Sequence, residues 1–428
     1  MTFPKPFLLL PLLAALAALA ARAELPAQGP AGDWSSAKPG KEYRITPADL
    51  PPPYATEFHH NTPKIVPRPD GAMPQVPADF QISEWASGLD HPRYLLTAPN
   101  GDIFVTESKP GRIRVLRDTN GDGSPDLNEV FADGLNRPFG LAFSPPGPDP
   151  EHLYVANTGS VVRFPYANGD TQASDKPETI TELSEGGHLE GGGHWTRDIC
   201  FSKDGKKLFV AIGSKTNVDK ENLEIEQHRA RILIMNPDGS EKAVYATGLR
   251  NPVGIAVHPE TGDLWTSVNE RDGLGDNLVP DYITHVKPGA FYGWPYFYIG
   301  PNPDPHHEEN PHTDLADTVT VPDVLVQSHS ATLNLAFYTG DQFPEEYRND
   351  IFAAFHGSWN RGIRTGYKVV RVPLDEGRAD GTYEDFVTGF VTDAADVWGR
   401  PVGLTVAKDG SLLISEDAHN TIWRVSRK

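Results

Sequence analysis

Short apolar runs separated by turn residues recur along the chain from about residue 79. Examples are Asp102-Ile103-Phe104-Val105 and Leu208-Phe209-Val210-Ala211, and a typical turn is Pro99-Asn100-Gly101-Asp102. Runs of this length, bounded by Gly, Pro, Asn and Asp, are typical of β-strands. The 40 glycines and 40 prolines agree with this, because both residues favour turns over helices. The pattern therefore predicts an all-β chain.

The runs form a phrase that occurs six times, each copy giving three short strands. The copies open at Pro92-Arg93, Arg137-Pro138, His194-Trp195-Thr196-Arg197, Arg250-Asn251-Pro252, Ala331-Thr332-Leu333-Asn334 and Arg400-Pro401. A fourth strand lies between copies, as in Glu129–Ala132 and Tyr383–Val387. Four-stranded units repeated at intervals of roughly 45 to 80 residues predict a six-bladed β-propeller.

The two ends of the repeat predict how the ring closes. The last copy reaches the C-terminus without a fourth strand, and Phe80–Trp85 supplies a strand before the first copy. We expect this N-terminal strand to pair into the last blade, because closure removes an exposed strand edge. The propeller domain should span residues 79–428. The proline-rich residues 24–78 should form an arm, either a linker or a segment that wraps the domain.

The first residues are typical of a secretory signal peptide, which we assign to residues 1–23. Lys5 precedes the apolar stretch Phe7–Ala20, and Ala21-Arg22-Ala23 offers small residues at a cleavage site. The apolar stretch is too short to cross a bilayer, which argues against the alternative of a membrane anchor. We expect cleavage near Ala23 and a periplasmic or secreted protein that does not span a membrane.

Charge and cysteine content exclude several classes of partner and cofactor. The net charge of −20 should repel nucleic acid and anionic lipid. Cys200 is the single cysteine, so the chain forms no internal disulfide, and we expect Cys200 in the core. Because no Cys-x-x-Cys-His occurs, no haem is attached covalently. Redox chemistry would need another cofactor and a separate electron acceptor, such as a cytochrome or a quinone.

The residues that open the copies should meet at one end of the channel, because the first strand of each propeller blade lines it. They are Arg93, Arg137, His194 with Arg197, Arg250 with Asn251, Asn334 and Arg400. A planar ligand with several carboxylates would neutralise such a ring of cations, since Arg binds carboxylates through two parallel hydrogen bonds. The alternative is that each Arg packs over an aromatic ring or pairs with an Asp of the next blade.

His194 suits a general base at this end of the channel. Its ordinary pKa lies near working pH, and a nearby arginine would keep the imidazole neutral. Taken alone, a histidine next to a tryptophan is more often structural than catalytic.

At this point several phrases carry a resemblance. They are His194-Trp195-Thr196-Arg197, Gly248-Leu249-Arg250-Asn251-Pro252, Asn269-Glu270-Arg271-Asp272 with Asp276, Phe291-Tyr292-Gly293-Trp294-Pro295, His356-Gly357-Ser358-Trp359-Asn360-Arg361 and Trp398-Gly399-Arg400-Pro401. Over residues 80–428 the chain resembles the glucose/sorbosone dehydrogenase family, and the sorbosone dehydrogenase branch more than the soluble glucose dehydrogenases. The resemblance implies a six-bladed propeller that binds pyrroloquinoline quinone and calcium and oxidises aldoses.

The resemblance also implies roles for single residues. His194 would take the proton of the substrate hydroxyl while hydride passes to the quinone. Arg250, with Asn251 beside it, would polarise the quinone oxygen. Cofactor carboxylates would be held by Arg361 and Arg400, and the opening ring adds Arg197 to the expected cofactor contacts. Calcium would bind the backbone carbonyls of Arg271 and Asp272 and the carboxylate of Asp276.

Three positions depart from the family pattern. Gly193 stands where glucose-oxidising members place an acid beside the histidine, and Leu135 stands where they place a glutamine that touches substrate. Both departures argue against glucose itself as substrate. The family lysine over the cofactor has no direct match, and we assign its role to Arg361 rather than to Arg364 or Lys368.

A second calcium site is predicted at residues 118–129, whose sequence fits the twelve-residue calcium loop. The expected ligands are Asp118, Asn120, Asp122, Asp126 and Glu129, with Gly123 at the sharp turn. Strands flank the loop, so we expect a structural calcium that locks a hairpin rather than a helical EF-hand. The alternative is an empty turn rich in Asp, Asn and Gly.

Together these features predict an exported quinoprotein dehydrogenase that oxidises an aldose or a sorbosone-like sugar aldehyde, by histidine-assisted hydride transfer to pyrroloquinoline quinone. One alternative is a calcium-dependent lactonase, which would need Glu, Asn and Asp facing a channel metal. Another is a propeller that binds a partner without catalysis. The propeller fold alone does not separate these functions.

Overall fold

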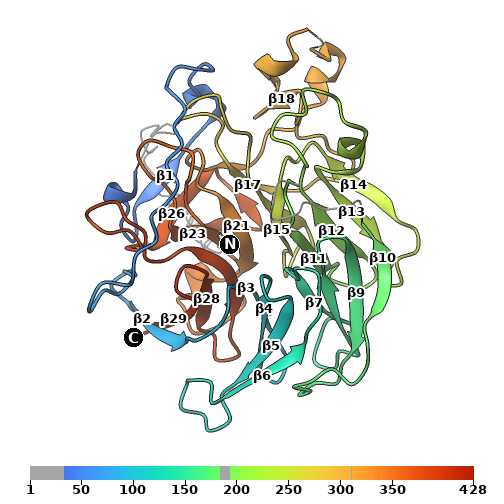
Figure 1. The fold of residues 1–428 in the computed structure, drawn as a ribbon, viewed down its shortest axis with the longest axis vertical. Coiled ribbons are helices and arrows are strands. Elements are labelled where there is room, and N and C mark those ends of the chain that lie inside the picture. Colours follow the sequence, from blue (N-terminus) through green and yellow to red (C-terminus); the bar gives the residue numbers. More distant parts are fainter. Residues whose placement is uncertain (1–32, 184–192, 310) are drawn as a thin grey trace, which may run out of the picture.

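The computed structural model describes residues 33–183, 193–309 and 311–428. The predicted signal peptide, residues 1–23, lies outside the described residues. Six sheets follow one another around a common centre in chain order (Figure 1), which confirms the predicted six-bladed propeller. Among the described residues, no helix is both long and apolar enough to cross a membrane.

Each blade is an antiparallel sheet with four main strands. Blades one to three contain β3 (Pro92–Thr97), β4 (Ile103–Glu107), β5 (Arg112–Arg117) and β6 (Leu127–Ala132); β7 (Leu141–Ser144), β8 (His152–Ala156), β9 (Ser160–Pro165) and β10 (Glu178–Glu182); and β11 (Arg197–Phe201), β12 (Leu208–Ile212), β13 (Arg231–Met235) and β14 (Ala243–Thr247). Blades four to six contain β15 (Pro252–Val257), β16 (Leu264–Val268), β17 (Tyr282–His285) and β20 (Val324–Leu325); β21 (Thr332–Phe337), β22 (Ile351–Phe355), β23 (Lys368–Val372) and β26 (Thr382–Val387); and β27 (Pro401–Val406), β28 (Leu412–Glu416), β29 (Thr421–Arg427) and β2 (Phe80–Ala86).

The remaining elements are short and lie in the arm or in loops. The strands among them are β1 (Glu42–Arg44) and two hairpins: β18 (Phe297–Tyr298) pairs with β19 (Asn302–Pro303), and β24 (Leu374–Asp375) pairs with β25 (Arg378–Ala379). The 3-10 helices are η1 (Trp34–Ser36), η2 (Pro47–Asp49), η3 (Glu224–His228), η4 (Pro305–His307), η5 (Thr313–Thr318) and η6 (Glu345–Tyr347). The stretch 296–326 holds β18, β19, η4 and η5, and its end supplies β20 to blade four.

The N-terminal strand closes the ring as predicted. β2 pairs antiparallel with β29, from Phe80 opposite Arg427 to Ala86 opposite Ile422. Phe80 is buried and meets the rings of Phe343, Tyr347 and Phe386 edge-on, at centroid distances of 4.7, 5.4 and 5.1 Å. The closure therefore buries an aromatic anchor as well as forming a ladder of backbone hydrogen bonds.

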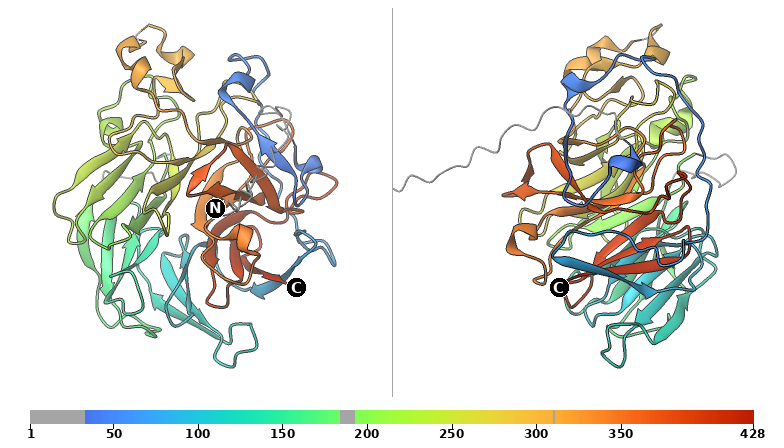
Figure 2. Two further views of the ribbon diagram at one scale, coloured as in Figure 1. Left: turned by 180° about the vertical axis from the view of Figure 1, so that it is seen from behind. Right: turned by 90° about the vertical axis from the view of Figure 1, so that its left-hand side faces the viewer.

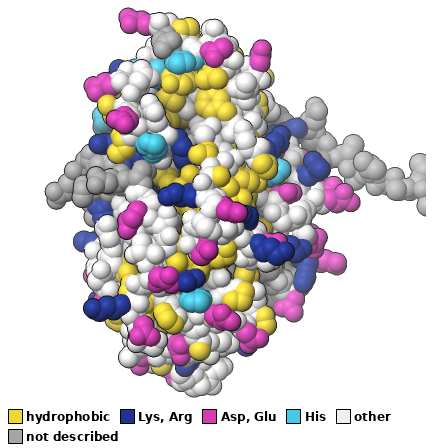
Figure 3. Space-filling model, turned by 90° about the vertical axis from the view of Figure 1, so that its right-hand side faces the viewer, with side chains coloured by type: hydrophobic (Ala, Val, Ile, Leu, Met, Phe, Trp, Pro, Cys, Tyr) yellow, Lys and Arg dark blue, Asp and Glu magenta, His cyan; other side chains and the backbone are white. Residues whose placement is uncertain are grey.

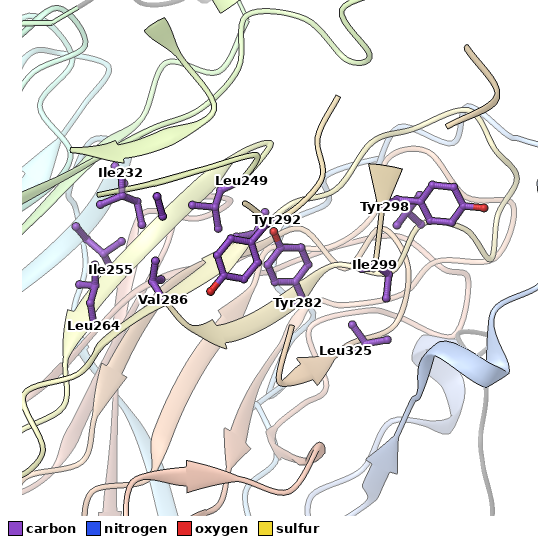
Figure 4. Packing of buried hydrophobic residues seen from close by; sticks show 14 of the residues in the cluster. Ile232, Leu249, Ile255, Leu264, Tyr282, Val286, Tyr292, Tyr298, Ile299 and Leu325 are labelled. Carbon is purple, nitrogen blue, oxygen red and sulfur yellow. The ribbon is translucent and has the colours of Figure 1, made fainter. Parts of the chain in front are cut away.

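Apolar cores lie between neighbouring blades. Figure 4 shows the one between blades three and four, where Ile232 and Leu249 face Ile255, Leu264 and residues around β17. Comparable clusters join the other adjacent pairs around the ring. Burial of apolar surface between sheets, at roughly 25 cal/mol per Å², is thus what holds the blades side by side.

A separate apolar cluster fills the channel itself. Its buried members are Phe139, Val253, Leu333 and Val402, and Tyr94 and Trp195 pack against them. Each blade contributes one of these six residues from the start of its innermost strand. We call this cluster the channel plug. It separates the loops at one end of the channel from the opposite end.

The opposite end opens into an apolar depression of about 480 Å³ between the ends of β3, β7, β11 and β15. Cys200 lies in its wall. Cys200, which we expected in the core, packs against the apolar cluster between blades three and four with its side chain partly buried.

The arm runs along the outside of the ring before it enters β2 (Figure 2). β1 pairs with β26 and adds a fifth strand to blade five. Further along, the arm forms isolated bridges from Ile65 to Val397 and from Gln75 to Thr388. Of the two alternatives left open for the arm, the structure therefore has the wrapping segment. Acidic and basic side chains are interspersed over the face that Figure 3 shows, without one dominant patch of either sign.

Replacing Phe80 by alanine should destabilise the fold strongly, because it removes a buried ring that holds the closing strand. We expect a loss of about 3–5 kcal/mol in the free energy of unfolding, measured with urea. Ser83→Ala on the exposed face of β2 is the matched control and should change stability by less than about 0.5 kcal/mol. Equal effects of the two variants would show that β2 does not anchor the ring.

Candidate active site

A cavity of about 210 Å³ lies at the end of the channel where the blades begin. It is lined by His194 from blade three, by Arg250, Asn251, Asn269, Glu270, Asp272 and Asp281 from blade four, and by His329, Ala331, Trp359 and Asn360 from blade five. Three of these residues stand one or two positions before a residue of the channel plug: His194 before Trp195, Asn251 before Val253 and Ala331 before Leu333. The cavity is therefore a polar site above an apolar floor.

The ring of His194 is held in one orientation and one neutral tautomer. Its Nδ1 lies 2.8 Å from the backbone oxygen of Ser214. A carbonyl oxygen only accepts, so Nδ1 carries the hydrogen and Nε2 carries the lone pair. Burial and the positive charge of Arg250 lower the pKa of His194 to about 3. The imidazole is therefore neutral near pH 7 and able to accept a proton at Nε2.

A buried arginine fixes the backbone behind His194. Arg229 donates from Nε to the carbonyl of Gly213 at 2.7 Å and from Nη2 to the carbonyl of Ser214 at 3.0 Å. It also donates from Nη2 to the carbonyl of His194. Arg229 is only 1% exposed. The same guanidinium thus positions both the histidine and the carbonyl that selects its tautomer.

Two glycines allow a very close approach of chain segments at this point. A Cβ on Gly193, whose φ is +82°, would lie 2.2 Å from the carbonyl oxygen of Lys215. A Cβ on Gly213 would lie 2.2 Å from Oδ1 of Asn251 and 2.7 Å from Cβ of His194. The acid that other family members carry at the position of Gly193 therefore has no space here.

Arg250 brings positive charge to the cavity, but protein acceptors already occupy its donors. It donates to the carbonyl of Asn269 at 3.2 Å and that of Glu270 at 2.7 Å, and to the carbonyl and side-chain oxygens of Asn217 at 3.1 and 2.9 Å. A longer contact of 3.5 Å reaches Asp272. Arg250 is therefore held rigidly, and it acts on the cavity chiefly through its charge.

Asn251 presents an unused polar atom. Its Oδ1 is buried and has no hydrogen-bond partner among the described residues. A buried amide oxygen without a partner is costly, at about 1–3 kcal/mol, unless a ligand or water satisfies it. Because Asn251 lines the cavity, this atom marks a place where a bound group would contribute a donor.

A second polar cluster on the cavity wall joins blades four and five. Asn360 donates through Nδ2 to Oδ1 of Asp272, and the same Nδ2 lies 3.1 Å from Nδ1 of His329. Burial acts to raise the pKa of Asp272, but His329 and Arg250 outweigh it and hold the pKa below its usual range. Burial acts to lower the pKa of His329, but Asp272 outweighs it and raises the pKa. The pair favours charge separation within the cavity wall.

Glu270 and Asp281 are buried acids that brace the loop carrying Asp272. Oδ1 of Asp281 accepts from the N–H of Glu270 at 2.8 Å, and Oδ2 accepts from the N–H of Ala331 at 2.7 Å. Burial raises the pKa of Glu270 to about 7 and that of Asp281 to about 6. The Asp281 carboxyl thus ties the openings of blades four and five together, whereas the Glu270 carboxyl accepts from the N–H of Arg271 at 3.1 Å within blade four.

The repeat and motif patterns did not single out His329, Asp281, Glu270, the carboxylate of Asp272, Trp359 or Asn360 as cavity residues. Glu270, Asp272, Trp359 and Asn360 did stand in phrases used for the family resemblance. His329 lies two residues before Ala331, at the looser fifth copy, and a histidine beside a blade opening is a signal that could have found it. Asp281 directly precedes β17, with no comparable pattern around it.

Other opening residues form a separate ionic cluster beside the cavity. Asp417 receives a hydrogen bond from Nη1 of Arg93, and its Oδ1 lies 2.9 Å from Nε2 of His356. Burial acts to raise the pKa of Asp417, but His356 and Arg93 outweigh it and hold the pKa far below its usual range. Arg400 lies against this cluster and donates to the carbonyl of His356 at 3.3 Å. It does not line the cavity.

Some of the residues that open the six copies therefore follow the alternative, in which the arginine packs over an aromatic ring or pairs with an acid. Arg93 pairs with Asp417, and both Arg93 and Arg137 lie over the ring of Trp195, at 5.7 and 5.5 Å from its centroid. Asn334 is 1% exposed and accepts from the N–H of Leu404, between two innermost strands. The predicted convergence of all six openings on one ligand is corrected accordingly.

Two residues expected at the cofactor lie outside the cavity lining. Arg197 is fully buried and donates to the backbone carbonyls of His194 and Thr196 at 3.0 and 2.8 Å. Arg361 donates to Oδ1 of Asn277 at 2.7 Å, and its neighbour Asn360 lines the cavity instead. Leu135, discussed as a substrate position, packs against the core between blades one and two.

In this structure the residues predicted for the catalytic calcium have other hydrogen-bond and ion-pair partners, and this metal site stays a prediction. The backbone oxygen of Asp272 accepts from Nδ2 of Asn217 at 3.1 Å. Arg271 points its guanidinium at Asp304, 3.2 Å away. Asp276 directs both carboxylate oxygens to other groups, Oδ1 to the N–H of His59 at 3.2 Å and Oδ2 to the N–H of Gly362 at 2.8 Å.

The loop predicted to hold a structural calcium is also built from internal hydrogen bonds. Asp118 accepts from the N–H groups of Gly121 and Gly123, both at 2.7 Å, Asp126 accepts from Thr119, Asn120 and Asp122 accept from the backbone two residues on, and Glu129 accepts from Thr171. Within the part of the chain that the structure describes, no three His, Cys, Asp or Glu side chains are placed to hold a metal. Calcium binding at this loop therefore stays a prediction.

A protein-family model described as Glucose / Sorbosone dehydrogenase matches residues 89–421. The chain belongs to this family. A protein of Borreliella burgdorferi is 36% identical over 237 residues, which cover 54% of this chain and 60% of that protein. The pyrroloquinoline quinone-dependent pyranose dehydrogenase of Coprinopsis cinerea is 24% identical over 412 residues, which cover 81% of this chain and 54% of that enzyme. Both matches span less than two thirds of the relative's own length.

The fold has counterparts among solved structures. The holo form of the pyranose dehydrogenase PQQ domain from Coprinopsis cinerea has a TM-score of 0.68 at 21% identity, over 86% of this chain and all of that chain. At this identity the likeness concerns the fold. What the cavity residues do chemically therefore rests on their own geometry.

The low pKa of His194 can be tested directly by NMR titration of its ring in the ligand-free protein, with the signal assigned through His194→Gln. A pKa lowered to about 3 means that the ring stays neutral as the pH falls from about 8 to about 5. We expect no titration of this signal in that range. A midpoint near about 6.5, the ordinary value, would contradict the buried and charge-shifted environment.

Gly213→Ala should disturb the site without a comparable effect on the fold. The added Cβ would press Asn251 away from His194. We expect a changed His194 ring signal and at least tenfold weaker binding of a cavity ligand, about 1.4 kcal/mol. Gly159→Ala is the matched control, since nothing lies within 4 Å of its Cβ position. If both variants leave the ring signal unchanged, the close packing is not what positions His194.

Proposed function

We propose that this protein is an exported dehydrogenase that oxidises an aldose or a related, sorbosone-like sugar aldehyde with pyrroloquinoline quinone and calcium. Family membership supports the class of reaction. The observation that carries the proposal is the pairing of a neutral, tautomer-fixed His194 with the charge of Arg250 in one cavity. A neutral base beside a fixed positive charge suits removal of a hydroxyl proton while negative charge develops nearby.

The cavity suits the cofactor at three residues. Arg250 would hold it through charge, Asn251 through its unpaired Oδ1, and His194 would face it from blade three. Arg400 stands beside the cavity, where it would meet a carboxylate that extends past the lining. The quinone supplies a carbonyl carbon that accepts hydride, with calcium acting as a Lewis acid on it.

The chain's own residues divide the remaining work. His194 accepts the hydroxyl proton of the substrate at Nε2 as the carbon–hydrogen bond breaks and the carbonyl of the product forms. Ser214 holds the opposite nitrogen through its backbone oxygen, and Arg229 holds that oxygen. The apolar channel plug excludes water from below. A separate acceptor, such as a cytochrome or a quinone, then removes the two electrons.

The lactonase alternative gains some support from Glu270, Asp272 and Asp281, acids that such a hydrolase would place around a metal. In this structure, however, backbone N–H groups or Asn360 already bind at least one oxygen of each of these carboxyls. These carboxyls are arranged to brace loops, so the dehydrogenase is the better-supported function. An assay for lactone hydrolysis therefore accompanies the test of the dehydrogenase, to detect the alternative activity.

Titration of the chelator-treated protein with pyrroloquinoline quinone in calcium tests the proposal. We expect one-to-one binding, followed by dye reduction that depends on an aldose or aldehyde. His194→Ala should bind the cofactor nearly as well and lose turnover by at least about 100-fold, since general-base catalysis contributes roughly 10²–10⁴. Absence of binding, or lactone hydrolysis without the quinone, would reject the dehydrogenase. Turnover that survives in His194→Ala would place the base elsewhere.

A further inference from the structure

We propose that residues 54–62 of the arm are a positioning element of the active site, and that His60 and Asn61 set the place of Trp359 at its entrance. The proposal rests on the proposed function in one respect, namely that a substrate enters this cavity. We call residues 54–62 the brace. It contacts two loops from outside: residues 271–276 of blade four and residues 358–364 of blade five.

The first half of the brace holds the blade-four loop. The N–H of Tyr54 donates to the carbonyl of Leu274 at 2.8 Å, and the N–H of Asp276 donates to the carbonyl of Glu57 at 3.1 Å. Nδ1 of His59 lies 3.0 Å from Oδ2 of Asp276. These bonds fix the loop that also carries Asp272 into the cavity.

The second half holds the blade-five loop. The N–H of Asn61 donates to the carbonyl of Trp359 at 2.7 Å, and its Nδ2 donates to the carbonyl of Gly362 at 2.9 Å. Arg364, which is 5% exposed, donates back to the carbonyl of Asn61 at 2.6 Å. The ring of His60 packs on the ring of Trp359 at a centroid distance of 5.5 Å.

Asp276 connects the two halves. Its Oδ2 receives the N–H of Gly362 at 2.8 Å, so one carboxylate joins the brace, the blade-four loop and the blade-five loop. From the cavity side, Asn360 bonds Asp272 across the same two loops. The cavity wall is thus held from within by one side-chain bond and from without by the brace.

The consequence for a substrate lies at Trp359. This side chain lines the cavity and is 41% exposed, which is unusual for a tryptophan and places it at the entrance. One face contacts His60, so loss of that contact frees the indole to move outward. The brace therefore sets the width of the entrance and, through Asp272 and Asn360, the shape of the wall. A group that acts in this way should alter substrate binding more than the chemical step.

The double variant His60→Ala/Asn61→Ala removes the ring contact with Trp359 and the side-chain hydrogen bonds of Asn61 with Gly362 and Arg364. In the ligand-free protein we expect faster amide hydrogen exchange in the blade-five loop, measured by mass spectrometry, because local opening becomes easier. Lys64→Ala is the matched control: it breaks an arm contact at the exposed side chain of Lys64, 2.7 Å from Asp396, away from the cavity. Exchange in the blade-five loop should be unchanged in that control.

With cofactor bound, the double variant should raise KM for the sugar on the order of tenfold while kcat changes less than about twofold. His60→Phe keeps a ring against Trp359 and should restore part of the loss when made in place of His60→Ala. A general loss of stability would instead lower kcat and the melting temperature together, and the conservative variant would not separate from alanine.

Unchanged exchange in the blade-five loop overturns the proposal, and so does faster exchange with an unchanged KM. If the wild-type protein oxidises no sugar, the proposed function fails, and the exchange comparison with Lys64→Ala still decides whether the brace positions the blade-five loop. The two failures are therefore distinguishable.

Discussion

The inner edges of the six innermost strands set the constraint on which the rest of the structure depends. Each such strand pairs with one neighbour in its own blade, so its other edge turns polar backbone groups toward the channel. Side chains of adjacent blades meet these groups: Asp198 accepts from the N–H of Ile255 at 2.9 Å, and Asn334 accepts from the N–H of Leu404 at 2.8 Å. Such bonds join the blades at the centre, where no further strand fits.

The same arrangement of innermost strands places polar and apolar environments only a few residues apart along the chain. Just before each innermost strand begins, its chain is outside the sheet and carries a polar residue such as His194 or Asn251. One or two residues later it carries a plug residue, Trp195 or Val253. Because the polar cavity and the apolar plug are so close, one side of His194 is buried by protein and its other side faces the cavity. A depressed pKa is the direct result.

Local repetition made the fold predictable from sequence. Each copy repeats the strand and turn pattern, so blade number, strand order and the closing role of Phe80–Trp85 follow from it. The placement of His194, Arg250 and Asn251 in one cavity also follows, since they open neighbouring copies. The direction in which a single side chain points does not follow from the repeat. Arg361 and Asn360 are adjacent in sequence, yet only Asn360 lines the cavity.

Contacts between distant segments could not be predicted from the sequence either, because no repeat relates the residues that form them. No repeat relates Asp276 to His59, which lies 217 positions away. The twelve-residue loop at 118–129 has the composition of a calcium site, but composition does not distinguish a convergent ligand set from a turn whose carboxylates bind their own backbone. Buried acids such as Asp281 gain their setting only when blades four and five come together.

The pairing of β2 with β29 has a consequence for how the protein acquires its structure. The two strands that complete blade six stand at opposite ends of the propeller sequence, so the ring cannot be finished until its final residues have been made. Until then β2 exposes an unpaired edge and the anchor Phe80. Contacts between such remote positions slow folding because a long loop must close first. Docking of β2 against β29, rather than formation of any single blade, is therefore the step that closes the ring.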